Sequence, residues 1–356
     1  MRPAIPVLLL LGGLNAALTA WLVVALRRWA VRRSLLDVPN DRSSHRTPTP
    51  RLGGVGITIG IYVLLMVWQI VTGQSPLDRP GLLVLNLATL LALVGLIDDV
   101  RGLSAGLRLV IQIAIAATAL AGLAALPRPH LVASFGPHVG LILGPGAALI
   151  AVVWIVGFVN AFNFMDGIDG IAGSQAVVAG LGWTIIGWQG GDQDLLALGL
   201  LLATGGAGFL TQNWAPARMF MGDVGSSFLG CLIALLPFLS GEPRRLFVPA
   251  VLMVWPFVFD TTYTMLRRVR RGDNLLTAHR SHLYQRLTQS GLTHGQVAAA
   301  YALLAGLGTG VALLWLWAQP PAALTGLGAI VLAACGLVLT AIRRERQQAA
   351  ATLQEA

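Results

Sequence analysis

Residues 4–33 read AIPVLLLLGGLNAALTAWLVVALRRWAVRR, a long apolar run followed by four arginines. A helix that spans a bilayer needs about 20 predominantly apolar residues. The apolar part, residues 4–26, is too long for the core of a signal peptide, and arginines follow it where a cleavage site would have small residues. We therefore interpret it as a retained first transmembrane helix.

The composition of the whole chain agrees with this start. Its 356 residues are 56% hydrophobic and 11% charged, whereas soluble domains carry about a quarter charged residues. The net charge of +9 is explained by contact with anionic lipid headgroups, so we expect no nucleic-acid partner. Cys231 and Cys335 lie far apart in apolar runs, which gives no support for a disulfide or a CxxC metal site.

Further apolar runs of spanning length predict an all-α, polytopic transmembrane helical bundle of about eleven helices. The expected spans are 4–26, 53–72, 81–97, 109–126, 139–159, 173–190, 195–213, 226–240, 247–266, 298–318 and 323–342. We expect residues 1–342 to form a single integral membrane domain and residues 343–356 to form a polar cytoplasmic tail.

The arginines predict the orientation of the bundle. Eleven spans place the two termini on opposite sides, and 19 of the 24 arginines then fall in loops on one side. Because cytoplasmic loops are enriched in basic residues, that side is predicted to be the cytoplasm. The N-terminus is therefore expected outside and the C-terminus inside, with the polar motifs on the cytoplasmic face.

The first cytoplasmic loop, residues 37–54, contains His45, Arg46 and Arg51. These side chains donate hydrogen bonds in a manner that suits phosphate. Taken alone, the loop is more typical of a juxtamembrane basic segment that touches anionic lipid.

Two adjacent carboxylates, Asp98 and Asp99, stand at the inner end of the third apolar run. Carboxylates near lipid are costly and are usually kept for function. Paired carboxylates also move each other's pKa apart, which suits a base beside a charge stabiliser. The alternative is a helix end that reaches water.

The segment 160–170, NAFNFMDGIDG, has polar residues at every third position: Asn160, Asn163, Asp166 and Asp169. Over this length such a stripe drifts half-way around an α-helix. Glycines at 167 and 170 indicate that the helix ends there and that the chain folds over a ligand. A capped helix end is the alternative interpretation.

Two further segments lie on the same side. Asp223, among glycines and serines in residues 213–227, could hold Mg²⁺ together with a substrate phosphate, or it could simply cap a helix. The cluster His279, Arg280 and His282 has the donors of a pyrophosphate clamp.

These five motifs, in this order between residues 37 and 287, resemble the polyprenyl-phosphate N-acetylhexosamine-1-phosphate transferase superfamily, glycosyl transferase family 4. The first loop is closest to the branch of O-antigen-initiating, undecaprenyl-phosphate GlcNAc-1-phosphate transferases. The resemblance implies a reaction in which a polyprenyl phosphate attacks the sugar-bearing β-phosphorus of a UDP-N-acetyl sugar, so that UMP leaves and a polyprenyl-diphospho-sugar forms. It also implies Mg²⁺, with Mn²⁺ as an alternative, a bacterial inner membrane, membrane lipid as a partner and the option of a homodimer.

The resemblance and the residue chemistry together give the candidate site. The candidate catalytic residues are Asp98, Asp99, Asp166, Asp169 and His282. The candidate substrate-binding residues are His45, Arg51, Asn160, Asn163, Asn213, Phe220, His279 and Arg280, with Asn213 and Phe220 matching positions that contact uracil in the family. The candidate metal ligand is Asp223.

Two points remain open at this stage. His279, Tyr284 and Gln285 depart from the pattern of the common-antigen enzymes, which favours a modified N-acetylated sugar and leaves Tyr284 to meet it. A transporter or flippase of lipid-linked or phosphorylated substrates is the main alternative, although transporters usually place charges near the bilayer midplane, and here the carboxylates fall at inner helix ends.

Overall fold

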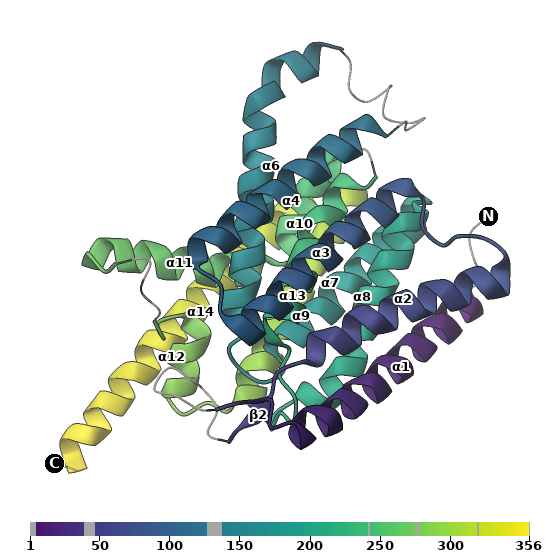
Figure 1. Ribbon diagram of the computed structural model, residues 1–356. Coiled ribbons are helices and arrows are strands. Elements are labelled where there is room, and N and C mark those ends of the chain that lie inside the picture. The colour runs from purple at the N-terminus through teal and green to yellow at the C-terminus, as the bar shows by residue number, and fades with distance from the viewer. Residues whose placement is uncertain are drawn as a thin grey trace.

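A computed structural model of the chain describes residues 5–38, 47–126, 137–240, 243–274, 277, 279–318 and 320–355. Its elements, in chain order, are α1 (Ile5–Arg32), β1 (Leu36–Asp37), β2 (Thr49–Pro50), α2 (Gly53–Thr72), α3 (Arg79–Arg101), α4 (Ala105–Ala125), α6 (Pro137–Met165), α7 (Ile171–Gly190), α8 (Gln193–Asn213), α9 (Gly222–Leu235), η1 (Leu236–Phe238), α10 (Pro243–Met253), α11 (Trp255–Arg271), α12 (Leu283–Gln289), α13 (His294–Trp317) and α14 (Pro320–Glu355). The predicted all-α membrane bundle is confirmed, and Figure 1 shows its long helices running side by side.

The number of spanning helices differs from the eleven expected. Nine helices in the described ranges are long and apolar enough to cross a bilayer, or ten if the bent pair α10–α11 is one span. The differences fall on the runs predicted at 226–240 and 247–266, and each has a physical cause.

The run 226–240 forms a short helix, because it is enclosed by protein. α9 and η1 together cover only Gly222–Phe238. Almost every side chain of α9 is buried, and the helix packs against α2, α3 and α6. A helix without lipid around it does not have to match the thickness of the hydrocarbon layer. We therefore describe α9 as a core helix.

The run 247–266 is broken rather than straight. α10 and α11 meet at a bend of 75°, and Pro256 occupies the first turn of α11. Proline has no N–H to continue the hydrogen bonding of the preceding helix, so it starts a new helix more readily than it extends an old one. As a result α11 projects sideways from the bundle (Figure 1).

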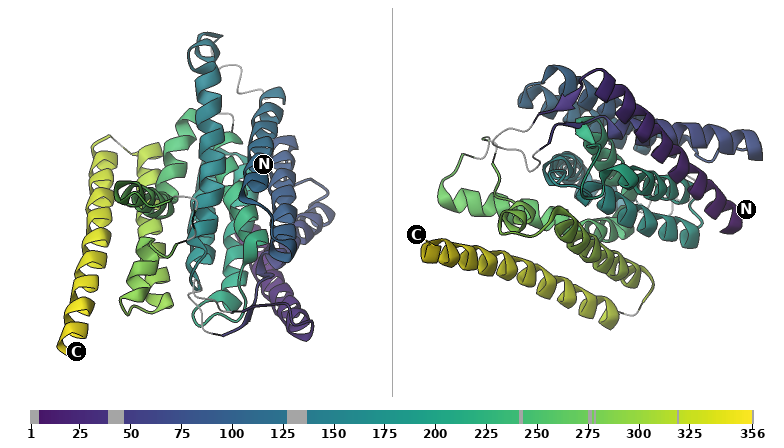
Figure 2. Two further views of the ribbon diagram at one scale, coloured as in Figure 1. Left: turned by 60° about the vertical axis from the view of Figure 1, so that its left-hand side comes forward. Right: turned by 90° about the horizontal axis from the view of Figure 1, so that it is seen from below.

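The two outermost helices lie on opposite edges of the bundle, as Figure 2 shows for α1 and α14. α14 runs without a break across the domain boundary expected at residue 342. Near its end, the Glu345 carboxylate accepts two hydrogen bonds from the Arg286 guanidinium of α12, at 2.6 and 2.7 Å. The side chain of Arg286 is only 5% exposed, so this pair connects the last helix to a buried charge beside α12.

The first turn of α9 is in main-chain contact with α2 and α3. A Cβ atom on Gly54 would lie 2.1 Å from the Gly225 Cα atom, and one on Gly95 would lie 2.3 Å from the Asp223 carbonyl oxygen. The N–H groups of Gly53 and Gly54 donate to the carbonyl oxygens of Phe220 and Met221, both at 2.9 Å. Only glycine permits this approach, which fixes where α9 begins.

We predict that Gly95→Ala lowers the free energy of unfolding by about 1–3 kcal/mol, because the added methyl group must displace the Asp223 main chain rather than a flexible side chain. Thermal unfolding in detergent measures the effect. Gly157→Ala in α6 is the matched control, because a Cβ atom there meets nothing within 4 Å. Equal stability of the two variants would contradict the close packing described here.

Candidate active site

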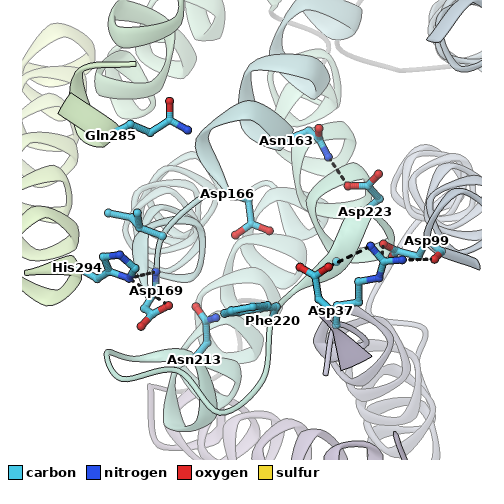
Figure 3. Close-up of a pocket in the computed structure, with 14 residues that line it drawn as sticks. Asp37, Asp99, Asn163, Asp166, Asp169, Asn213, Phe220, Asp223, Gln285 and His294 are labelled. Atoms are coloured by element: carbon cyan, nitrogen blue, oxygen red, sulfur yellow. Dashed lines mark hydrogen bonds and ion pairs between the residues drawn. The ribbon is translucent and has the colours of Figure 1, made fainter. Parts of the chain in front are cut away.

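A polar cavity of about 260 Å³ opens where the first turn of α9 meets the ends of α3, α6 and α8 (Figure 3). Its walls carry five carboxylates, one guanidinium, one imidazole, three side-chain amides and one aromatic ring. The lining residues are Asp37, Arg51, Asp99, Asn163, Asp166, Gly167, Ile168, Asp169, Asn213, Phe220, Gly222, Asp223, Gln285 and His294.

The described residues of the loop between α1 and α2 form one wall of this cavity. β1 pairs with β2 in antiparallel register, so that Asp37 lies opposite Thr49, and the Phe220 N–H donates to the Pro50 carbonyl at 2.7 Å. These main-chain contacts place the Arg51 guanidinium 3.7 Å from Asp99 and 3.8 Å from Asp37. Arg51 therefore supplies positive charge at the carboxylate-rich wall. His45 lies outside the described residues.

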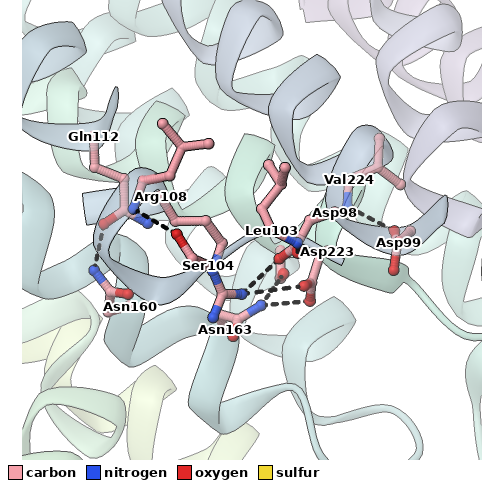
Figure 4. Close-up of polar contacts among 12 residues, drawn as sticks. Asp98, Asp99, Leu103, Ser104, Arg108, Gln112, Asn160, Asn163, Asp223 and Val224 are labelled. Atoms are coloured by element: carbon pink, nitrogen blue, oxygen red, sulfur yellow. Dashed lines mark hydrogen bonds and ion pairs between the residues drawn. The ribbon is translucent and has the colours of Figure 1, made fainter. Parts of the chain in front are cut away.

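The adjacent aspartates of α3, Asp98 and Asp99, accept hydrogen bonds from different parts of the chain (Figure 4). Asp98 accepts hydrogen bonds from the Leu103 N–H and from the Arg108 guanidinium, both at 2.6 Å. Asp99 accepts one from the Val224 N–H at 3.1 Å, at the start of α9. Successive residues on a helix point about 100° apart, so the two carboxylates cannot face one ligand side by side. Only Asp99 lines the main cavity.

Asp223 joins these groups from the first turn of α9. Its carboxylate accepts a hydrogen bond from the Asn163 amide at 2.7 Å, and it lies 3.5 Å from the Arg108 guanidinium. Its side chain is 34% exposed, compared with 8% for Asp98. Asp223 is therefore the carboxylate of this group that a ligand in the cavity can reach most easily.

Asp166 lies in the middle of the cavity (Figure 3). Its carboxylate has no hydrogen-bond or ion-pair partner among the described residues. Burial, together with the carboxylates of Asp223, Asp99 and Asp169, raises the pKa of Asp166 well above its ordinary value. Such a concentration of negative charge favours a cation between the carboxylates.

The donor set fits a hard divalent cation that also binds substrate. In the described part of the chain, no three His, Cys, Asp or Glu side chains are grouped closely enough to hold a metal alone. Mg²⁺ does not need such a cage, because it is commonly held by one or two carboxylates together with substrate phosphates and water. Asp223 and Asp166 are the oxygen donors that meet this description.

The turn between α6 and α7 has the conformation that its glycines predicted. α6 ends at Met165, and Gly170 precedes α7 with φ of +82°. The Asn213 side chain accepts a hydrogen bond from the Gly170 N–H and donates one to the Met219 carbonyl, both at 3.0 Å. Asn213 therefore holds this turn against the loop that carries Phe220.

The remaining asparagine of the stripe faces a different neighbour. The Asn160 amide donates to the Gln112 side chain at 2.6 Å, and it lines a small side cavity together with Asp98 and Arg108. Asn163 lines this side cavity too, and of the two asparagines only Asn163 also lines the main cavity, where it reaches Asp223.

His282 lies next to the cavity but does not line it. Its side chain is 5% exposed, and its Nδ1 atom lies 3.2 Å from the buried carboxylate of Asp260. The same carboxylate accepts hydrogen bonds from the N–H groups of Leu283 and Tyr284 and from the Tyr301 hydroxyl, at 2.8, 3.0 and 2.6 Å. Asp260 thus holds both the His282 ring and the beginning of α12.

Two expectations for this loop change with the structure. Tyr284, which was expected to meet the sugar, is 1% exposed and donates its hydroxyl hydrogen to the Phe164 carbonyl at 2.9 Å; that expectation is wrong, because the side chain connects α12 to the end of α6. Its neighbour Gln285 lines the cavity instead. Burial and the nearby His282 lower the pKa of His279 to about 4, which disfavours the positively charged imidazole that a pyrophosphate clamp would use.

The predicted site residues thus separate into two groups. Those that line the main cavity are Arg51, Asp99, Asn163, Asp166, Asp169, Asn213, Phe220 and Asp223. Those that do not line it are Asp98, Asn160, His279, Arg280 and His282.

Three polar side chains of the lining, Asp37, Gln285 and His294, were not among the predicted site residues. Asp37 begins the first loop, and only its pairing with β2 brings it to the cavity. Gln285 was singled out only because it departs from the sequence pattern of the common-antigen enzymes. His294 has a signal that was available in the sequence, because Thr293 and Gln296 form a capping box that starts a helix.

Comparisons with known proteins agree with this geometry. Residues 82–241 match the family model described as glycosyl transferase family 4. The chain is 32% identical over 275 residues to the probable undecaprenyl-phosphate N-acetylglucosaminyl 1-phosphate transferase of Bacillus subtilis. The matched region covers 75% of this chain and 74% of the relative. It is 31% identical to the undecaprenyl-phosphate alpha-N-acetylglucosaminyl 1-phosphate transferase of Yersinia pestis, covering 81% and 80%. It is 28% identical to the decaprenyl-phosphate N-acetylglucosaminephosphotransferase of Mycobacterium tuberculosis H37Rv, covering 94% and 90%.

We predict that Asp260→Ala lowers the free energy of unfolding by about 3 kcal/mol or more, because it leaves several buried donors without an acceptor. Tyr301→Phe, which removes a single hydrogen bond to the same carboxylate, is expected to cost about 1 kcal/mol. Thermal unfolding in detergent compares the two. An Asp260→Ala variant as stable as the wild type would show that this carboxylate does not hold α12.

Proposed function

This chain belongs to glycosyl transferase family 4, and on that basis we propose that it transfers an N-acetylhexosamine-type sugar-1-phosphate from a UDP-sugar to a polyprenyl phosphate such as undecaprenyl phosphate, releasing UMP. The names of its relatives support a polyprenyl phosphate as the acceptor and the transfer of a sugar phosphate as the reaction. The observation that carries the proposal is the cavity in which Asp99, Asp166 and Asp223 converge with Arg51.

The reaction exchanges one phosphoanhydride bond for another. An oxygen of the polyprenyl phosphate attacks the β-phosphorus of the UDP-sugar, the bond from the β-phosphorus to its bridging oxygen breaks, and UMP leaves with that oxygen. Phosphoryl transfer of this kind depends mainly on positioning and on neutralising negative charge. The carboxylates of this cavity repel a diphosphate, so charge neutralisation is the requirement that the site has to meet.

Different residues would bind the metal ion, bind a phosphate and hold the carboxylates in place. Asp223, with Asp166 beside it, would hold Mg²⁺, which would supply positive charge to the diphosphate. Arg51 is placed to donate hydrogen bonds to a phosphate at the Asp99 wall. Arg108 keeps Asp98 and Asp223 at a fixed separation by contacting both carboxylates.

We place the reaction at the cytoplasmic face of a bacterial inner membrane, as the first step of a lipid-linked glycan such as an O-antigen. The multi-pass bundle and the membrane enzymes among its relatives support a membrane location. The side is supported by the seven arginines between residues 27 and 51, a segment that reaches the cavity through Arg51, because basic residues are enriched in cytoplasmic loops. Charges at this position, rather than at mid-membrane, also favour an enzyme over a transporter or flippase.

The direct test is an assay of the purified protein with labelled UDP-GlcNAc and undecaprenyl phosphate in detergent. We expect UMP and a labelled lipid product to appear together, in equal amounts and only when Mg²⁺ and both substrates are present. A panel of UDP-N-acetyl sugars then ranks the donors. Absence of UMP release with every donor in the panel would contradict the proposal.

We predict that Asp223→Asn lowers kcat by roughly 100-fold, because the amide keeps the shape of the side chain but loses the charge that binds a hard cation. The Mg²⁺ concentration for half-maximal activity should rise in parallel. Asp194→Asn is the control, since Asp194 is a buried carboxylate near the other end of α8, where it accepts hydrogen bonds from the Asp78 and Gly81 N–H groups. Near-normal turnover with an unchanged Mg²⁺ response in Asp223→Asn would remove this residue from the metal site.

A further inference from the structure

The cavity has two chemically distinct ends. Asp99 and Asp223 occupy one end, whereas His294, Asp169, Asn213 and Phe220 lie together at the other (Figure 3). The first end carries the negative charge and the donors described above for a diphosphate. The second end offers an aromatic ring, on which a base can stack, and an imidazole paired with a carboxylate.

His294 is held firmly at this second end. It is the first residue of α13, and the capping box of Thr293 and Gln296 fixes where that helix begins. Its Nδ1 atom lies 3.3 Å from the Asp169 carboxylate, and its side chain is 21% exposed. The other Asp169 oxygen accepts a hydrogen bond from the Ala217 N–H at 3.0 Å. The imidazole is therefore oriented by the protein and still open to a ligand.

The contacts of Nδ1 determine which ring nitrogen a ligand meets. The Asp169 N–H approaches Nδ1 at 3.5 Å and needs a lone pair there, whereas the Asp169 carboxylate at 3.3 Å needs a proton. The carboxylate is closer, and its negative charge makes its hydrogen bond the stronger one. We assign the proton to Nδ1. Nε2, which makes no hydrogen bond with the described residues, then presents an acceptor.

We propose that His294 binds the nucleoside of the donor substrate: Nε2 accepts a hydrogen bond from an N–H or O–H group of the nucleoside, and Asp169 fixes the tautomer that makes this acceptor available. The proposal rests on the proposed function for the identity of the nucleotide. Phe220, at the same end of the cavity, offers the flat face on which a base can stack.

This role has a consequence for recognition. An acceptor at Nε2 favours a ligand that has a donor in that place, either the imide N–H of a uracil base or a ribose hydroxyl. A site that is built to accept a hydrogen bond loses affinity for an analogue that lacks the donor. The two sources are distinguished by 3-methyl-UMP, which lacks the imide hydrogen, and by 2′-deoxy-UMP and 3′-deoxy-UMP, which each lack one hydroxyl.

The test measures binding of UMP and these analogues to the full-length protein in detergent by calorimetry. Loss of one hydrogen bond predicts that His294→Ala weakens UMP binding about three- to ten-fold. One analogue should bind the wild type more weakly by a similar factor, and His294→Ala should no longer distinguish it from UMP. A purely structural effect of the substitution would weaken all of these ligands alike.

Two amide variants separate contact from positioning. The Gln amide can reach the position of Nε2, whereas the shorter Asn amide can replace only Nδ1 beside Asp169. We expect His294→Gln to keep more UMP affinity than His294→Asn. Asp194→Asn, near the start of α8 and away from Asn213 at the end of that helix, is the control and should bind UMP like the wild type once its folded fraction is confirmed by thermal unfolding.

The outcomes are decisive in both directions. Wild-type affinity in His294→Asn, or equal affinity in all His294 variants, would overturn the proposal. If the wild type binds UMP with the predicted dependence on His294 but releases no UMP from any UDP-sugar, the nucleoside contact stands and the proposed function fails. If the wild type does not bind UMP at all, the nucleoside contact fails.

Discussion

The main-chain contact between α9 and the helices α2 and α3 is the constraint on which the site depends. α9 is too short to be held by the bilayer, and its first turn is instead fixed by glycines at 54 and 95 that allow backbone to approach backbone. Because Asp223 stands in that turn, the same contact determines its distance from Asp98 and Asp99 of α3. A carboxylate on a short enclosed helix is thereby positioned by packing.

The polar groups around α9 are distributed over neighbours that lie far apart in sequence. From α3, Asp98 shares Arg108 with Asp223, and Asp99 accepts a hydrogen bond from the Val224 N–H. The end of α6 contributes Asn163 and Asp166, and the loop before α9 contributes Phe220. Each contribution comes from a helix end, where the chain can expose polar groups without placing them in lipid. This explains how a chain that is 56% hydrophobic can carry five carboxylates in one cavity.

Sequence reasoning predicted the fold class and most of the cavity, because both depend on strong local signals. Apolar runs mark the spans, and glycines beside aspartates mark the turn at 166–170. It could not separate Asp98 from Asp99, since the rotation between neighbours matters only once the partners Arg108 and Val224 are known. It also missed Asp37 and His294, whose positions depend on the pairing of distant segments. The bend between α10 and α11 had a visible signal in Pro256, but an apolar run alone does not say whether a proline will kink or break a span.

The contact between Arg286 and Glu345 has a consequence for how the protein is made. The two residues are 59 positions apart, so Glu345 leaves the ribosome well after Arg286. Until it emerges, the guanidinium beside α12 has no carboxylate partner from α14, although α12 already has to be placed against the end of α6. Chains are synthesised and fold from the N-terminus, so this end of the bundle would be completed only when α14 has been inserted. A chain that stops before Glu345 would carry every residue of the cavity and still lack the partner that secures α12.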